Sequence, residues 1–177
     1  MKLTLEVRVK VGEKEVYSVE HDGFCRATAA WLSYWQMANA VNVTNTSGGA
    51  AAPGQLMSVA APATNATYGP VVGTGTGAFD FDNQALGTLI AHGNGAGQLQ
   101  YGATTFTAPQ TVGNDRYFEI IRTFQNASGS DITVNEIGLY GNSSSVYYCL
   151  AREVIGGGIL VPNGQTLTVT YKIKVSL

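Results

Sequence analysis

The chain has 177 residues, with ten Lys and Arg, twelve Asp and Glu, and a formal net charge of −2. This length is sufficient for one domain with a sound core, but a charged fraction of 12% is about half the ~25% usual for soluble domains. The absence of a basic excess excludes binding to nucleic acid or anionic membrane by charge attraction, and no apolar run of about 18 residues predicts a membrane helix.

The few charges are distributed unevenly along the chain. Residues 1–26 hold ten, residues 115–177 hold ten, and the 88 residues between hold only Asp80 and Asp82. Charge is depleted at the cores of protein interfaces, so the middle segment is predicted to pack against other protein. A set of long, neutral, solvated loops is the alternative.

The first 40 residues predict two strands and a helix. Residues 3–11 alternate apolar and polar, which is typical of a half-buried strand, and a second strand is expected around Val16–Val19. These first 20 residues form either strands of the domain or an N-terminal arm. Asp22 is expected to cap a helix near 23–39. Its aromatic face packs on the sheet or docks a neighbouring subunit, and consists of Phe24, Ala27, Thr28, Trp31, Tyr34, Trp35 and Ala38.

The middle of the chain predicts short elements separated by loops. Strands are expected at 41–46 and 68–73, and residues 97–106 read as extended. Residues 47–67 form a long loop rich in Gly, Ala and Pro. A short helix near 83–92 is expected to be capped by Asp82 and ended by Gly93.

Residues 117–140 predict two strands around the polar turn 126–131, as in a hairpin. The apolar side chains lie on one face of the second strand at Val134 and on the other face at Ile137. Such a change of face predicts a β-bulge near Asn135–Glu136. Arg122 and Glu136 would then face one another across the hairpin and pair. Strands are also expected at 146–154 and over 167–175, with a turn or bulge at 156–158. The whole chain, residues 1–177, therefore predicts a single antiparallel β-sandwich, of which the jelly roll is one form.

No motif in the sequence predicts catalysis or a cofactor. Residues 73–78 match a Gly-rich dinucleotide fingerprint, but without the βαβ context that the fingerprint requires. Asp80, Asp82 and Asn83 lack the spacing of a calcium loop, so no metal site is expected. Cys25 and Cys149 are predicted to be buried free thiols, with a disulfide as the minority alternative.

Two segments carry a family resemblance. One is Phe124-Gln-Asn-Ala-Ser-Gly running into Val134-Asn-Glu-Ile-Gly-Leu-Tyr140, and the other is Leu150–Val154 followed by Val161–Tyr171. Together they resemble virion structural proteins of tailed bacteriophages, the small β-proteins of heads and tails. The resemblance covers about the last third of the chain and implies a symmetric, non-enzymatic virion component made in the host cytoplasm.

The expectation is therefore a capsid decoration or cement protein, a homo-oligomer with a trimer favoured, bound to a major capsid protein or another virion protein. A tail fibre, collar or baseplate component is the first alternative. A carbohydrate-binding adhesion module, with Trp31, Trp35 or Tyr101 stacking on sugars, is the second. The candidate interface residues are aromatic: Trp31, Tyr34, Trp35, Tyr68, Phe79, Phe81, Tyr101 and Phe106.

Overall fold

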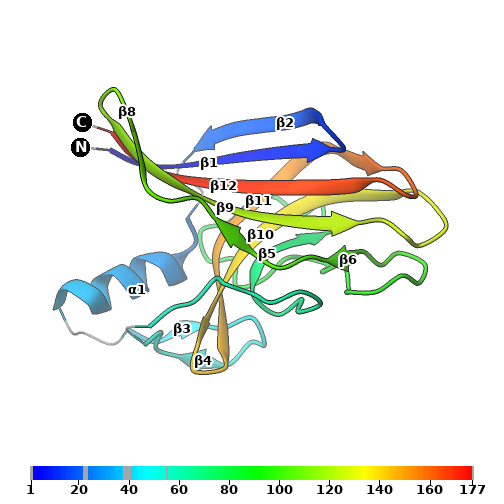
Figure 1. Cartoon of the computed structure of the whole chain (residues 1–177). Coiled ribbons are helices and arrows are strands. Elements are labelled where there is room, and N and C mark those ends of the chain that lie inside the picture. The colour runs from blue at the N-terminus through cyan, green and yellow to red at the C-terminus, as the bar shows by residue number, and fades with distance from the viewer. Residues whose placement is uncertain (1, 22–23, 38–40, 55, 177) are drawn as a thin grey trace.

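A computed structural model of the chain describes residues 2–21, 24–37, 41–54 and 56–176; the side chains of residues 2, 21 and 34–37 lie outside the description. The fold is mainly β, with antiparallel sheets and one described helix (Figure 1), as the sequence predicts. The expected cap residue Asp22 and the side chains of Tyr34 and Trp35 fall outside the described part.

The larger sheet, here sheet A, has the order β2-β1-β12-β9-β6. Its strands are β2 (Lys14–His21), β1 (Lys2–Val11), β12 (Thr166–Ser176), β9 (Asp115–Gln125) and β6 (Gln100–Tyr101). Two short strands, β7 (Thr105–Phe106) and β8 (Gln110–Val112), also pair with β9. Because β1 lies between β2 and β12, the first 20 residues are integral strands and not an arm.

The smaller sheet, here sheet B, has the order β11-β10-β5, formed by β11 (Val146–Val161), β10 (Ile132–Ser143) and β5 (Gly69–Gly73). Leu5, Val7 and Val9 of sheet A and Ile137 and Leu139 of sheet B are buried in one apolar core cluster. Sheets of seven and three strands make this an unequal sandwich, unlike the eight-stranded jelly roll.

The helix α1 (Arg26–Met37) and a two-stranded ribbon, β3 (Val43–Thr44) with β4 (Ala50–Ala51), lie on the opposite side of the molecule from sheet A (Figure 1). Residues 47–54 and 56–67 are otherwise the long loop that the sequence predicts. Ala27 and Thr28 of the predicted helical stripe are buried, as is Ala30 next to it.

The expected hairpin over 117–140 is wrong. β9 pairs with β12 in sheet A and β10 pairs with β11 in sheet B, so the turn at 126–131 crosses between the sheets. Asn126 holds this crossing turn in place: its fully buried amide donates to Ser130 O and Val161 O, both at 2.8 Å, and its Oδ1 accepts from Ser128 N. The bulge is confirmed, because the β10–β11 register shifts between Val134 and Glu136.

The expected helix near 83–92 is also wrong, since residues 81–92 form turns, bends and isolated bridges. The backbone amides of Gly87 and Thr88 donate to the Glu136 carboxylate, at 3.0 and 2.9 Å, instead of to carbonyls within a helix. Ile90 N donates to Val72 O of β5. A buried carboxylate distant in sequence therefore replaces the hydrogen bonds that a helix requires.

Candidate interaction surface

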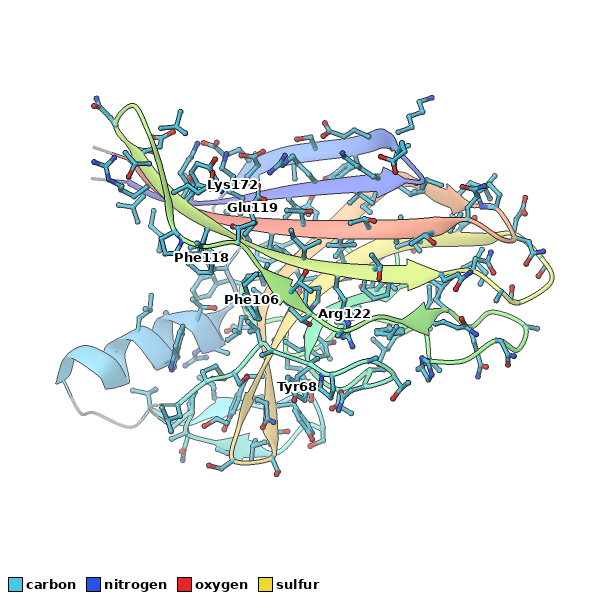
Figure 2. The ribbon with its side chains drawn as sticks, in the orientation of Figure 1. Tyr68, Phe106, Phe118, Glu119, Arg122 and Lys172 are labelled. Atoms are coloured by element: carbon cyan, nitrogen blue, oxygen red, sulfur yellow. The ribbon has the colours of Figure 1, made fainter. Side chains whose placement is uncertain are left out.

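A deep apolar trough opens between α1, sheet A and sheet B. Its volume is about 390 Å³, within the range of sites that enclose a bound group. Phe118 lies on the side of β9 that faces α1 (Figure 2). The trough is lined by Leu3, Phe24, Thr28, Trp31, Leu32, Met57, Val59, Phe118, Ile120, Leu139, Leu150 and Ile173.

The trough is open because the inward apolar faces of β1, β9 and β12 are incompletely covered at this end. Leu5 has no exposed surface, whereas Leu3, on the same face of β1, is 42% exposed. Among the described lining residues, Thr28 has the one hydroxyl, and it donates to Leu150 O at 2.6 Å. The lining therefore favours an apolar occupant.

A second, shallower hollow of about 670 Å³ adjoins the trough, and Met57 and Val59 line both. Leu56 and Phe106 are exposed on its wall. The two hollows make one apolar surface that runs from Phe106 past Phe118, both visible in Figure 2. Exposed apolar surface of this extent on a folded chain marks an interaction site.

A second apolar feature is the aromatic loop, residues 77–83. Phe79 and Phe81 are 42% and 56% exposed, and Asp80 between them is exposed too. Asp80 Oδ1 accepts from Asp82 N at 2.7 Å, and Asn83 Oδ1 accepts from Asp80 N at 2.8 Å. The loop therefore has a defined conformation in which two aromatic rings face outward.

A buried ion pair holds the aromatic loop to the sandwich. The Arg152 guanidinium on β11 lies 2.8 Å from the Glu136 carboxylate on β10, and both side chains are buried. Arg152 also donates to Gly77 O at 2.8 Å, Ala78 O at 3.1 Å and Asn83 Oδ1 at 2.9 Å. Buried charges require such complete pairing, so this cluster fixes the loop geometry.

Arg122 has a similar organising role on the other side of β5. The expected pair with Glu136 is wrong: the Arg122 guanidinium is buried and donates to the carbonyls of Gly102, Tyr68, Pro70, Pro62 and Asn65. Its carbon Cζ lies 4.9 Å from the Tyr101 ring centroid. Burial lowers the pKa of Arg122 to about 10. Arg122 therefore fixes the loop that precedes β5, and this loop lies below β9 in Figure 2.

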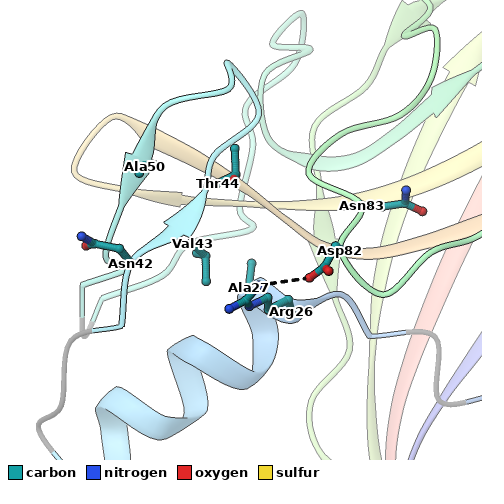
Figure 3. Close-up of a pocket in the computed structure, with 8 residues that line it drawn as sticks. All are labelled: Arg26, Ala27, Asn42, Val43, Thr44, Ala50, Asp82 and Asn83. Carbon is teal, nitrogen blue, oxygen red and sulfur yellow. Dashed lines mark hydrogen bonds and ion pairs between the residues drawn. The ribbon is translucent and has the colours of Figure 1, made fainter.

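A polar pocket of about 330 Å³ lies beside the start of α1 (Figure 3). Its lining includes Asn42 and Thr44 near β3 and an exposed Arg26–Asp82 ion pair at 3.4 Å. Asp82, the expected helix cap, therefore pairs with the first residue of α1. Because the two charges neutralise one another, the pocket has no net charge for recruiting an ionic ligand.

The outward face of sheet A carries a lattice of charges. Glu6 contacts Arg8 at 3.1 Å and Lys172 at 3.3 Å, and Arg8 also pairs with Glu119. Lys172 and Glu119 lie on this side of the sheet in Figure 2. By contrast, most of the exposed large apolar residues belong to the nearly uncharged middle segment: Leu32, Val41, Leu56, Phe79, Phe81, Leu89, Phe106 and Val112. The charges are therefore concentrated on one face, and most of the exposed large apolar side chains belong to other parts of the molecule.

The residues that the sequence predicts to form an interface differ in their exposure in the structure. Phe79, Phe81 and Phe106 are exposed, Trp31 lines the trough, and Tyr68 is partly buried and stacks on Tyr147. Tyr101 is only 2% exposed and packs edge-on against Phe124, so it belongs to the core and not to an interface.

Sequence reasoning missed the trough residues Leu3 and Phe118. Each lies on the apolar parity of its strand, where burial is the default expectation. The alternation within a strand does not tell whether the facing sheet covers that end of the strand.

Groups with reactive side chains are few. No set of three or more His, Cys, Asp or Glu side chains within the described ranges is placed to hold a metal ion, and no helix there is long and apolar enough to cross a membrane. His92 Nδ1 accepts from Tyr101 N at 3.1 Å. Cys25 and Cys149 are buried free thiols, as predicted, with 3.6 Å between their sulfurs.

Comparison with known proteins finds no matching family model, no curated protein and no solved structure with significant similarity.

Proposed function

We propose that this chain is a virion structural protein, most specifically a capsid decoration or cement protein that stabilises an assembled shell by bridging its subunits. The observation that carries the proposal is the two-sided surface. A charged lattice covers the outward face of sheet A, and the exposed side chains of Leu32, Leu56, Phe79, Phe81 and Phe106 lie elsewhere on the molecule. Such a chain is suited to contact protein with one side and water with the other. The phage-protein resemblance of the last third supports the same class.

The mechanism is physical and not chemical. Each copy contacts more than one shell subunit through apolar surface, and a homo-oligomer, with a trimer favoured, binds through several copies at once. Multivalent attachment gives high avidity from modest single contacts. Because the protein binds the assembled state preferentially, it stabilises that state by RT ln(1 + [L]/Kd), about 4 kcal/mol at a thousandfold excess over Kd.

The same surface suits a tail, collar or baseplate component, which keeps the class and changes the location. The carbohydrate-binding alternative has less support. Sugar sites combine an exposed ring with polar partners, whereas Tyr101 is buried and the trough beside Trp31 has Thr28 as its one polar lining residue.

The test is thermal disruption of particles with and without this chain. Particles that lack it should disrupt at lower temperature, and purified protein should restore their resistance. The restoration should vary little with salt, because apolar contacts are not screened. The Leu56→Ser/Phe106→Ser double variant should restore less, while Lys10→Gln on the charged face serves as a matched control. If depleted particles keep full thermal resistance but lose attachment to cells, cementing is refuted and the tail location replaces it.

A further inference from the structure

We propose that the aromatic loop of one copy inserts into the apolar trough of a second copy, with Asp80 of the loop pairing with Arg116 at the rim of the trough. The inference deepens the self-association part of the proposed function, because it names the two surfaces that meet. It rests on three independent features of the described residues: a preorganised loop, an open trough and two complementary charges.

Hydrogen bonds fix the conformation of the aromatic loop. Arg152 anchors Gly77, Ala78 and Asn83 from inside the sandwich, and Arg26 N donates to Phe81 O at 2.9 Å from the start of α1. The buried Arg152–Glu136 pair thus fixes a loop whose aromatic rings remain largely in water. Fixing a loop in its bound conformation lowers the entropy cost of association, so this arrangement favours binding through the loop.

The trough is the complementary surface. Its volume of about 390 Å³ is open to solvent at Leu3 and Leu32, and the one hydroxyl among its described lining residues, that of Thr28, is already hydrogen-bonded. Aromatic side chains that enter well-packed, water-excluding sites dominate binding energies at interfaces. Phe79 and Phe81 supply such side chains without polar groups that would require partners inside the trough.

Charge complementarity favours a second copy over an unrelated apolar ligand. Arg116 lies two residues from Phe118 and shares its face of β9, because side chains i and i+2 of a strand point the same way. Its guanidinium donates only to the backbone carbonyls of Gly113 and Asp115. Within the described part of the chain, neither Arg116 nor Asp80 has an ion-pair partner. An acidic residue between two aromatic ones therefore matches an apolar trough with a basic rim.

The contact is heterologous. Arg26 and Ala27 of α1 lie on the side of Asp82 and Asn83, next to the aromatic loop, while Thr28, Trp31 and Leu32 line the trough. The loop and the trough are therefore two different surfaces of the chain, beside different residues of α1. Heterologous contacts that close by rotation form rings, which agrees with the favoured trimer.

The experiment is a charge exchange read out by light-scattering mass and sedimentation, up to about 100 µM protein. Asp80→Arg and Arg116→Asp should each raise the dissociation constant at least about tenfold, and the double variant Asp80→Arg/Arg116→Asp should restore association. Phe79→Ser/Phe81→Ser should abolish it. Lys10→Asp on the charged face of sheet A and Leu160→Ser, an exposed apolar residue of β11, are the matched controls and should leave the mass unchanged. Circular dichroism establishes that every variant is folded.

A wild-type chain that remains at its monomer mass of 18.6 kDa overturns the proposal, as does association that survives both single charge reversals. Native mass spectrometry showing a bound lipid in a monomer would assign the trough to a ligand instead. The two proposals fail separately. A chain that self-associates as described but does not protect shells refutes only the cement function, and a monomeric chain that protects shells refutes only this contact.

Discussion

The buried pair Glu136–Arg152 permits a stringent test of the fold. Glu136 has no exposed surface and accepts hydrogen bonds from Gly75 N at 2.9 Å, Gly87 N, Thr88 N and the Arg152 guanidinium. Glu136→Gln keeps the size of the side chain but replaces one acceptor oxygen by a donor NH₂ and leaves Arg152 as an uncompensated buried cation. Removing one partner of a buried pair costs ~3–5 kcal/mol.

This loss is measured by urea unfolding. With a slope of about 2 kcal/mol/M, a loss of about 4 kcal/mol lowers the unfolding midpoint by about 2 M. Arg152→Met should cost a similar amount. The double variant should lose less than the sum of the two single losses, with a coupling of about 1–3 kcal/mol, because each single variant already orphans the other charge.

Glu20→Gln is the matched control. Glu20 pairs with Lys174 on the solvent side of sheet A and is 42% exposed, so its loss should stay within about 1 kcal/mol. A loss below about 1 kcal/mol for Glu136→Gln at unchanged slope, or strict additivity in the double variant, would show that the pair does not hold the aromatic loop to sheet B.

Three further predictions concern titration, thiol access and packing. Burial raises the pKa of Tyr101 and Tyr171 above the ordinary value of 10. Their contribution to stability is therefore complete below pH 10 and is lost as pH rises further. Absorbance at 295 nm should show the exposed tyrosines ionising first, and these two ionising only with alkaline unfolding. Their ionisation in step with the exposed tyrosines, before any loss of circular dichroism, would contradict this. Cys25 and Cys149 are buried, and the pKa of Cys149 is raised by the neighbouring thiol and by burial. A thiol reagent should therefore modify neither cysteine in the native protein and both after denaturation. Trp31→Ala should destabilise by about 2–3 kcal/mol, below the ~3–5 of a fully buried aromatic residue, because Trp31 lines the trough and is only partly buried; an unchanged urea midpoint would refute that packing.

The sequence alone determined the class of fold and several local features. The alternation over Leu3–Val11 fixed a half-buried strand because side chains of a strand alternate between faces, and the structure has β1 at Lys2–Val11. The parity switch after Val134 marked the place where the β10–β11 register shifts, although the extra residues at this irregularity lie in β11. The exposed candidates Phe79, Phe81 and Phe106 followed from their being aromatic residues of the middle segment, which holds only two charges.

Partners distant in sequence were decided only by the tertiary structure. The turn at 126–131 has the composition of a hairpin, yet Asn126 bonds to Val161 O and directs the chain into the other sheet. Residues 83–92 have helical spacing, yet the carboxylate of Glu136 takes the amides of Gly87 and Thr88. The alternation of apolar residues along a strand likewise does not reveal the trough. Whether an apolar residue such as Leu3 is covered depends on where the facing sheet ends, and that is a property of the assembled sandwich, not of any single strand.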